Sequence, residues 1–251
     1  MSVTSIVNHK GGVGKTTTTL NLGKALSLKG FSVLIVDFDP QANLSDSIGV
    51  VDPKRTIKDT LLEEGSSLPI HKIADNFYLA PSELQLATAE SKLKGQELAG
   101  YLALKEALDP VRKDYDYILI DCPPSLGVLT SNAFMASDEV MIVLSSQFLP
   151  TRGLATTIDA IKYAKRFNNN IQVSGILITQ FEQTVIQKSI IEELKAKYGN
   201  LVYESMIRKN VAVQEASAMR TDVFSYDSKS AAANDYGNLC EEIIAKQKIH
   251  G

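Results

Sequence analysis

The sequence predicts an α/β fold, with a doubly wound, mostly parallel sheet flanked by helices. Short apolar runs rich in β-branched residues alternate with amphipathic stretches along most of the chain, which is typical of βαβ units with right-handed crossovers. A glycine-rich loop follows the first apolar run and precedes the first amphipathic stretch. The 251 residues show no linker, low-complexity tract or internal repeat, so the economical prediction is a single domain, 1–251.

Several apolar runs are predicted to be strands buried on both faces of the sheet, because they are short and bounded by turns or charges. In chain order they are Val3–Val7, Ser32–Val36, Tyr117–Ile120, Val140–Leu144 and Val173–Ile178. The stretch 50–100 is less regular, and there we expect short strands near Ile70–Ile73 and Phe77–Ala80. Helices are predicted where apolar residues recur at helical spacing. They are Thr16–Lys29, Gln96–Lys113, Leu154–Phe167, Val185–Tyr198 and Ala232–Lys246.

The composition favours a cytoplasmic protein. Net charge is −3, from 26 basic and 29 acidic side chains, so whole-chain charge does not argue for a nucleic-acid partner, and a local basic patch would be needed. The two cysteines, Cys122 and Cys240, are too few and too far apart for a disulfide framework or a metal cluster. The sequence shows no signal-peptide pattern and no apolar run of the roughly 18 residues that a membrane helix needs.

The most informative segment is the glycine-rich loop 10–17, KGGVGKTT. Glycines let the backbone curl so that successive N–H groups point inward around a polyphosphate, and the N-terminus of the following helix adds partial positive charge. Lys15 can reach the β- and γ-phosphates, and the Thr16 hydroxyl can ligate Mg²⁺. Because a strand precedes the loop and a helix follows it, the segment predicts binding of a nucleoside triphosphate with Mg²⁺.

One position departs from the ordinary phosphate-loop pattern. That pattern, G-x-x-x-x-G-K-[ST], places glycine at position 9, where this chain has His9, and an extra lysine, Lys10, follows it. The alternative interpretation is a glycine-rich turn that binds nothing, which we set aside because strand, loop and helix all agree. We expect His9 to be a loop residue rather than a catalyst.

Aspartates follow two of the predicted strands. Asp37 and Asp39 come at the carboxyl end of the second strand, and Asp121 ends the strand at Tyr117–Ile120. In doubly wound sheets ligands bind at that edge, and an aspartate there can hold the Mg²⁺ shell, usually through water. One such aspartate is more often a loop starter or helix cap. Two such sites beside a phosphate loop indicate a metal-dependent nucleotide site.

Two motifs resemble the deviant Walker A group of P-loop ATPases, and specifically the ParA (Soj-like) partition ATPases. They are the loop 10–17 and the segment Asp37–Gln41, DFDPQ. Supporting stretches spread over nearly the whole chain are 121–127 (DCPPSLG), 207–211 (IRKNV), 215–216 (EA) and 226–230 (YDSKS). The resemblance implies a P-loop NTPase fold of the deviant Walker A type. It also implies an ATP hydrolase that uses ATP and Mg²⁺ and forms a homodimer around two sandwiched nucleotides.

The resemblance assigns roles to individual residues. Lys10 would be the signature lysine that reaches the partner's phosphates, Gly12 would lie where two backbones approach the facing nucleotides, and Asp39 would position the attacking water. The expected catalytic residues are Lys10, Lys15 and Asp39. The expected metal-site residues are Thr16, Asp37, Asp39 and Asp121. Asn210 would border the adenine, and the expected nucleotide contacts are Lys10, Gly11, Gly12, Val13, Gly14, Lys15, Thr16, Thr17 and Asn210.

The resemblance further implies that ATP-bound dimers bind DNA non-specifically on the nucleoid and that a ParB-like partner stimulates hydrolysis, which segregates or positions plasmid or chromosomal DNA. The family often has Ile-Pro-Arg-Asn-Val-Arg where this chain has Ile207–Ala212, so some usual DNA-facing arginines are absent. Contacts to the DNA backbone need charge rather than a fixed side chain, so other cations can substitute. The candidates, each of which is otherwise an ordinary surface charge, are Lys188, Arg208, Lys209, Arg220 and Lys229.

Related functions stay open as alternatives. An ATPase that positions a non-DNA protein cargo would carry every motif above. A MinD-like ATPase binds membranes through a C-terminal amphipathic helix, but the glutamates and the short apolar character of 240–251 argue against a stable membrane anchor. An enzyme like the nitrogenase iron protein needs two cluster cysteines per subunit, and neither Cys122 nor Cys240 is placed for that. A scaffold without turnover is disfavoured by the intact Asp39 and Lys15.

Overall fold

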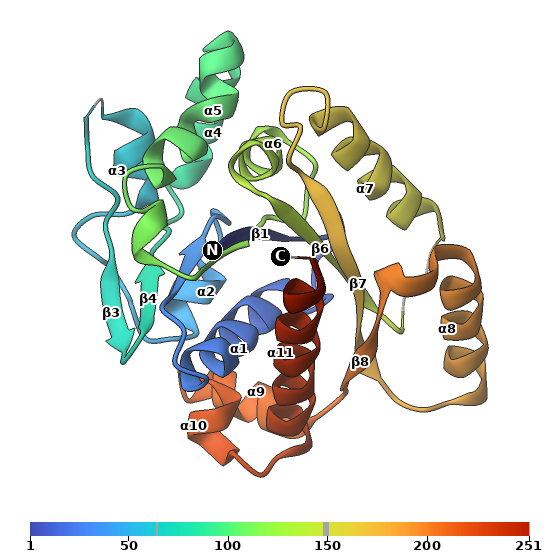
Figure 1. Cartoon of the computed structure of the whole chain (residues 1–251). Coiled ribbons are helices and arrows are strands. Elements are labelled where there is room, and N and C mark those ends of the chain that lie inside the picture. Colours follow the sequence, from blue (N-terminus) through green and yellow to red (C-terminus); the bar gives the residue numbers. More distant parts are fainter. Residues whose placement is uncertain (64, 148–150, 251) are drawn as a thin grey trace.

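A computed structural model describes residues 1–63, 65–147 and 151–250, and in these residues it shows an eight-stranded sheet with helices on both faces (Figure 1). The strand order is β3-β4-β2-β5-β1-β6-β7-β8, and only the β3–β4 pair is antiparallel within this sheet. The prediction of a doubly wound, mostly parallel sheet is therefore confirmed. The strands are β1 (Ser2–Val7), β2 (Val33–Asp37), β3 (His71–Ala74), β4 (Phe77–Ala80), β5 (Tyr117–Asp121), β6 (Glu139–Ser145), β7 (Gln172–Phe181) and β8 (Val202–Arg208).

The helices form one layer on each face of the sheet (Figure 1). One layer contains the helix after the glycine-rich loop and the C-terminal helices, and its members are α1 (Lys15–Leu28), α2 (Asn43–Asp46), α9 (Val211–Ala218), α10 (Val223–Asp227) and α11 (Ala231–His250). The opposite layer consists of α3 (Ile57–Leu62), α4 (Leu86–Lys94), α5 (Glu97–Leu108), α6 (Val128–Ala136), α7 (Thr151–Ala164) and α8 (Val185–Tyr198). Short 3₁₀ turns lie at Arg112–Asp114 and Gly199–Leu201.

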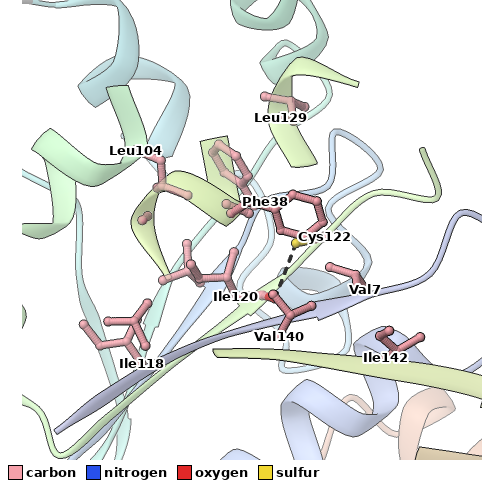
Figure 2. Close-up of a cluster of buried hydrophobic side chains, with 14 of the residues drawn as sticks. Val7, Phe38, Leu104, Ile118, Ile120, Cys122, Leu129, Val140 and Ile142 are labelled. Atoms are coloured by element: carbon pink, nitrogen blue, oxygen red, sulfur yellow. Dashed lines mark hydrogen bonds between the residues drawn. The ribbon is translucent and has the colours of Figure 1, made fainter. Parts of the chain in front are cut away.

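Alternate strand residues supply the cores on the two faces. In β2, Leu34 and Val36 belong to the cluster under α3–α8, while Val33 and Ile35 belong to the cluster under α1 and α11. This is the period-two consequence of a strand covered on both sides, and it explains why the strand sequences are almost continuously apolar. Figure 2 shows part of the first cluster, with Ile118 and Ile120 of β5 below helical side chains that include Leu104 of α5 and Leu129 of α6.

Cys122 belongs to that apolar cluster. Its thiol is fully buried and donates a weak hydrogen bond to the carbonyl oxygen of Ile120 at 3.7 Å, the dashed line in Figure 2. Burial raises the pKa of the Cys122 thiol well above its ordinary value. Such a thiol is an inert core group. In the described part of the chain no three His, Cys, Asp or Glu side chains gather as metal ligands.

Most of the predicted elements lie within one or two residues of their predicted bounds, while β7, α7 and α11 differ by three or four residues at one end or both. The prediction of one helix over Gln96–Lys113 is wrong, because α5 ends at Leu108 and Pro110 has no N–H group with which to continue the helical hydrogen bonds. Helix α6 was not predicted, since its residues are mostly buried and it lacks the polar face that marks an amphipathic helix. Strand β8 and helices α2, α3, α4, α9 and α10 were also not predicted. No helix among the described residues is long and apolar enough to span a membrane.

Both edges of the sheet are modified. Edge strand β3 has only four residues and is antiparallel to its neighbour β4. Along edge strand β8, backbone N–H groups donate to carboxylates of α11: those of Glu204 and Ser205 to Glu242, at 3.0 and 2.9 Å, and that of Arg208 to Asp235, at 2.9 Å. Side chains of the last helix thus occupy donors that an added strand would use.

The central strands should tolerate loss of core volume poorly. Ile35 is fully buried between α1 and the sheet. We expect Ile35→Ala to lower the free energy of unfolding by about 2–5 kcal/mol, because it removes apolar contacts and leaves a cavity. The matched control is Ile186→Ala, whose side chain is 73% exposed at the start of α8 and whose effect should stay within about 0.5 kcal/mol. Equal losses in the two variants, measured by chemical denaturation, would contradict this packing.

Candidate functional site

The loop between β1 and α1 has a backbone that only glycine adopts easily at two points. Gly12 has φ +73° and Gly14 has φ +92°, both in the left-handed region where a side chain causes strain. Gly14 is the N-cap of α1, and no described side chain caps the helix there. The first amides of α1 are therefore available to an anion, as at other helix N-termini.

Two polar side chains of β7 donate hydrogen bonds to carbonyl oxygens of this loop. The Thr179 hydroxyl donates to the carbonyl oxygen of Val13 at 2.7 Å, and the Gln180 side-chain amide donates to the carbonyl oxygen of Gly12 at 2.8 Å. Both residues come from the carboxyl end of β7. These bonds draw the loop carbonyls toward β7, which favours an opposite orientation of neighbouring N–H groups.

Lys15, the first residue of α1, is a nearly buried cation. Its Nζ donates to the carbonyl oxygen of Lys10 at 3.2 Å. Burial lowers the pKa of Lys15, while the carboxylates of Asp121 and Asp39 act in the opposite direction. A buried ammonium is costly unless it is paired, so this position favours an anionic ligand.

Asp37 holds the loop that follows β2. One of its oxygens accepts hydrogen bonds from the Ser45 amide at 2.8 Å and the Ser45 hydroxyl at 2.7 Å. Burial raises the pKa of Asp37 to about 6, and the bonds from Ser45 oppose that shift. Asp39, two residues on, accepts a bond from the Gln41 amide at 2.9 Å through one oxygen. The two aspartates are thereby oriented before any ligand binds.

Asp121, at the end of β5, lies opposite Asp37 in the strand register and is fully buried. Neither of its carboxylate oxygens accepts a hydrogen bond of normal geometry from the described residues. Burial and the nearby Asp37 charge raise the pKa of Asp121 well above its usual range, although the Thr16 hydroxyl and Lys15 oppose this. An orphaned buried carboxylate is rare and needs an explanation. A hydrated Mg²⁺ beside Thr16 would satisfy both oxygens, so these residues fit the ion.

A cavity of about 740 Å³ opens over the loop, a size typical of ligand sites. It brings Asn210 to the same space as the phosphate loop, although 193 to 199 positions separate it from residues 11–17. Asn210 caps α9 by accepting a hydrogen bond from the Ala212 amide at 2.8 Å. The lining residues include Gly11, Gly12, Gly14, Lys15, Thr16, Thr17, Asp39, Gln41, Asn43, Pro124, Gln147, Thr179, Gln180, Ile207, Arg208, Lys209, Asn210, Val213, Gln214 and Tyr236.

Sequence reasoning missed Thr179 and Gln180. The available signal was their position, because polar residues directly after a buried parallel strand lie at the ligand-binding edge of a doubly wound sheet. Of the remaining predicted residues, Lys10 and Val13 belong to the loop without lining the cavity, and Asp37 and Asp121 lie beneath it as buried groups.

The cations proposed for DNA contact have different surroundings. Arg208 makes a bidentate pair with the nearly buried Asp235, its Nη2 lying 2.6 Å from Oδ1. In the other two pairs the acid is exposed as well as the cation. Lys209 Nζ lies 2.8 Å from Glu182 Oε1, and Arg220 Nη2 lies 3.1 Å from Asp46 Oδ1. The two exposed residues without an acidic partner among the described residues are Lys188 and Lys229.

A phosphate loop that leaves a central parallel strand and enters a helix, with buried carboxylates at the ends of adjacent strands, defines the class of P-loop nucleoside triphosphatases. Residues 1–173 match a family model described as an AAA domain. The chain is 36% identical to the sporulation initiation inhibitor protein Soj of Bacillus subtilis, over 97% of this chain and 98% of that protein. It is 34% identical to the chromosome partitioning protein ParA of Caulobacter vibrioides, over 99% of this chain and 96% of that protein.

The protein belongs to the ParA (Soj-like) family of P-loop ATPases, and it is an ATP hydrolase that uses Mg²⁺. A solved structure with a similar fold contains a nucleotide and magnesium. Cobyrinic acid a,c-diamide synthase from Mycobacterium smegmatis, with bound ADP and magnesium, superposes with a TM-score of 0.84 at 30% identity, covering 99% of this chain and 96% of that one.

Lys15→Ala should abolish ATP binding, because the phosphates lose their main buried counter-charge. We expect a loss of at least about 100-fold in affinity for a fluorescent ATP analogue, the scale of a desolvated charge-assisted hydrogen bond. Lys92→Ala, which removes an exposed lysine on α4, is the control and should bind normally. Near-native affinity in the Lys15 variant would refute the site assignment.

Asp121→Asn should separate stability from activity. Without nucleotide and Mg²⁺, we expect it to raise the free energy of unfolding by about 1–3 kcal/mol, because it removes a buried charge that Asp37 repels. The same variant should lose most Mg²⁺-dependent ATP hydrolysis. Asp109→Asn is the control: its exposed carboxylate pairs with Lys105 at 2.6 Å, and its removal should change stability by less than about 0.5 kcal/mol. A less stable Asp121 variant with full activity would oppose this interpretation.

Proposed function

We propose that this ATPase forms a dimer around two ATP molecules, binds DNA without sequence preference in that state, and is released when a ParB-like partner stimulates hydrolysis. Repeated cycles would segregate or position plasmid or chromosomal DNA on the nucleoid. The observation that carries the proposal is a phosphate loop with two lysines, Lys10 and Lys15, in a chain that aligns along almost its full length with Soj and ParA. Lys15 is nearly buried beside the loop, and the resemblance to the family assigns Lys10 to the second copy.

The reaction is transfer of the γ-phosphoryl group of ATP to water. Backbone N–H groups of 11–17 and the Lys15 ammonium bind the phosphates and hold them in line for attack. When bound, Mg²⁺ neutralises charge on the phosphate oxygens, and Thr16 and Asp121 would hold it with Asp37 supporting the shell. Asp39 uses one oxygen for the Gln41 amide and keeps the other for the attacking water. Lys10 of the second copy supplies positive charge to the oxygens where negative charge develops.

This arrangement predicts slow turnover without a partner. A single subunit contains the phosphate-binding groups and the water-positioning carboxylate, but the second cation comes from another copy. An equivalent cation supplied in trans accelerates hydrolysis by about 10³–10⁵ in other P-loop enzymes. An activator that aligns Lys10 in the dimer would therefore control the lifetime of the ATP state.

The proposed DNA contacts are the exposed cations. Lys188 and Lys229 have no acidic partner among the described residues. The exposed ion pairs of Lys209 and Arg220 contribute little to stability, so a DNA phosphate can replace the acid in either pair. Arg208 is different, because its bidentate pair with buried Asp235 is expensive to break. We assign Arg208 chiefly to holding β8 against α11 beside the nucleotide cavity.

A second candidate function is positioning of a protein cargo in place of DNA. It is favoured by the charge compensation just described, since three of the five cations proposed for DNA already contact acids. A membrane-associated cycle is the third outcome that the test below distinguishes.

Asp39→Ala provides the test, because it should bind ATP, dimerise and hydrolyse poorly, and so accumulate the ATP state. We expect it to bind a random-sequence 40-base-pair duplex with ATP but not with ADP. Affinity should fall steeply from 50 to 200 mM salt, by about 10³-fold or more if six phosphates are contacted. Charge reversal of Lys188 and Lys229 should weaken binding, while reversal of Lys92 should not. Binding that is equal with ADP, absent altogether, or seen only with anionic vesicles would overturn the DNA proposal.

A further inference from the structure

The side chain of His9 lies against the first turn of α7. A Cβ atom added at Gly153 would lie 2.0 Å from Cε1 of His9 and 2.7 Å from its Nε2. Carbon atoms normally pack about 3.5–4.0 Å apart, so the imidazole occupies the space that any side chain at position 153 would need. The phosphate loop and α7 (Thr151–Ala164) therefore meet through a histidine ring and a glycine.

The residues on either side of His9 are anchored elsewhere. Asn8 is buried, and its amide group donates to the carbonyl oxygen of Val143 in β6 at 2.6 Å, while its oxygen accepts from the Lys10 amide at 2.9 Å. The Lys10 carbonyl oxygen accepts from Lys15 Nζ at 3.2 Å. The backbone of Lys10 is thus held at its nitrogen and at its oxygen.

The histidine replaces the glycine of the ordinary phosphate-loop pattern at this position. With glycine at position 9, the start of the loop would be attached to a neighbouring element only through the hydrogen bond from Asn8 to β6. The imidazole adds a second attachment, to α7, on the residue directly before Lys10. The absence of a side chain at Gly153 is the complementary feature, because it makes room for the ring.

We propose that His9 is a positioning residue for Lys10: its ring, seated against Gly153, fixes the direction in which the Lys10 side chain leaves the loop toward the second subunit. The inference rests on the proposed role of Lys10 in hydrolysis. Displacing the ring should slow turnover and leave ATP affinity almost unchanged, because Gly12 and Val13 keep their hydrogen bonds to β7 and Lys15 keeps its bond to the loop. Misplacement of a catalytic group by about 1 Å can cost about 100-fold in rate.

The experiment is a cycle of four proteins: native, His9→Ala, Gly153→Ala and the double variant. Intrinsic Mg²⁺-ATP hydrolysis is measured at saturating ATP, and affinity is measured with a fluorescent ATP analogue. We expect each single variant to lose at least about fivefold in turnover, with affinity within about twofold of native. The double variant should be no slower than His9→Ala alone, because both changes act through one contact. Gly237→Ala is the control, since a Cβ at that α11 glycine meets no atom within 4 Å.

Two results would overturn the inference. One is native turnover in Gly153→Ala, and the other is losses that multiply in the double variant. A general folding defect would instead lower melting temperature and ATP affinity together, which the control variant and the affinity measurement expose. Lys10→Ala separates this inference from the proposed function. If Lys10→Ala is slow and Gly153→Ala is native, only the role of His9 fails; if Lys10→Ala hydrolyses ATP normally, the proposed role of Lys10 fails first.

Discussion

The structure depends on an electrostatic imbalance at the carboxyl edge of the sheet. One nearly buried ammonium, that of Lys15, lies among three buried carboxylates, those of Asp37, Asp39 and Asp121. Burying charge without compensation is unfavourable, and the raised pKa of Asp121 expresses that cost. A triphosphate with Mg²⁺ adds anionic oxygens beside the lysine and a dication beside the carboxylates. Ligand binding therefore compensates these buried charges. Without a ligand, extensive apolar packing on both faces of the sheet offsets their cost.

Packing on both faces also fixes where the charged groups lie. Parallel strands β1, β2 and β5 are adjacent and end together, so side chains at their carboxyl ends converge although Asp37 and Asp121 are far apart in sequence. The layer of α1 and α11 lies on one face and α3–α8 lie on the other (Figure 1). Because the carboxyl ends of these parallel strands meet at one edge between the layers, the charged groups of the site gather there.

The strands and the phosphate loop could be predicted from sequence because their signals are local. β-branched apolar runs and the KGGVGKTT pattern require no knowledge of neighbours. The position of Thr179 and Gln180 after a predicted strand was also a local signal, but their contacts to Val13 and Gly12 could not be predicted, since they depend on how β7 aligns with β1 across β6. The same holds for Arg208, whose partner Asp235 is 27 positions away on α11. Helix α6 was missed for the converse reason, since a buried helix carries no amphipathic signal.

The carboxylates that α11 presents to β8 have a consequence for assembly. An exposed sheet edge is a template for pairing with another chain. Here the N–H groups of β8 that could donate to an added strand already donate to Glu242 and Asp235. These carboxylates also place negative charge where that strand's carbonyl oxygens would approach. The carboxylates of α11 therefore disfavour the addition of another strand at β8.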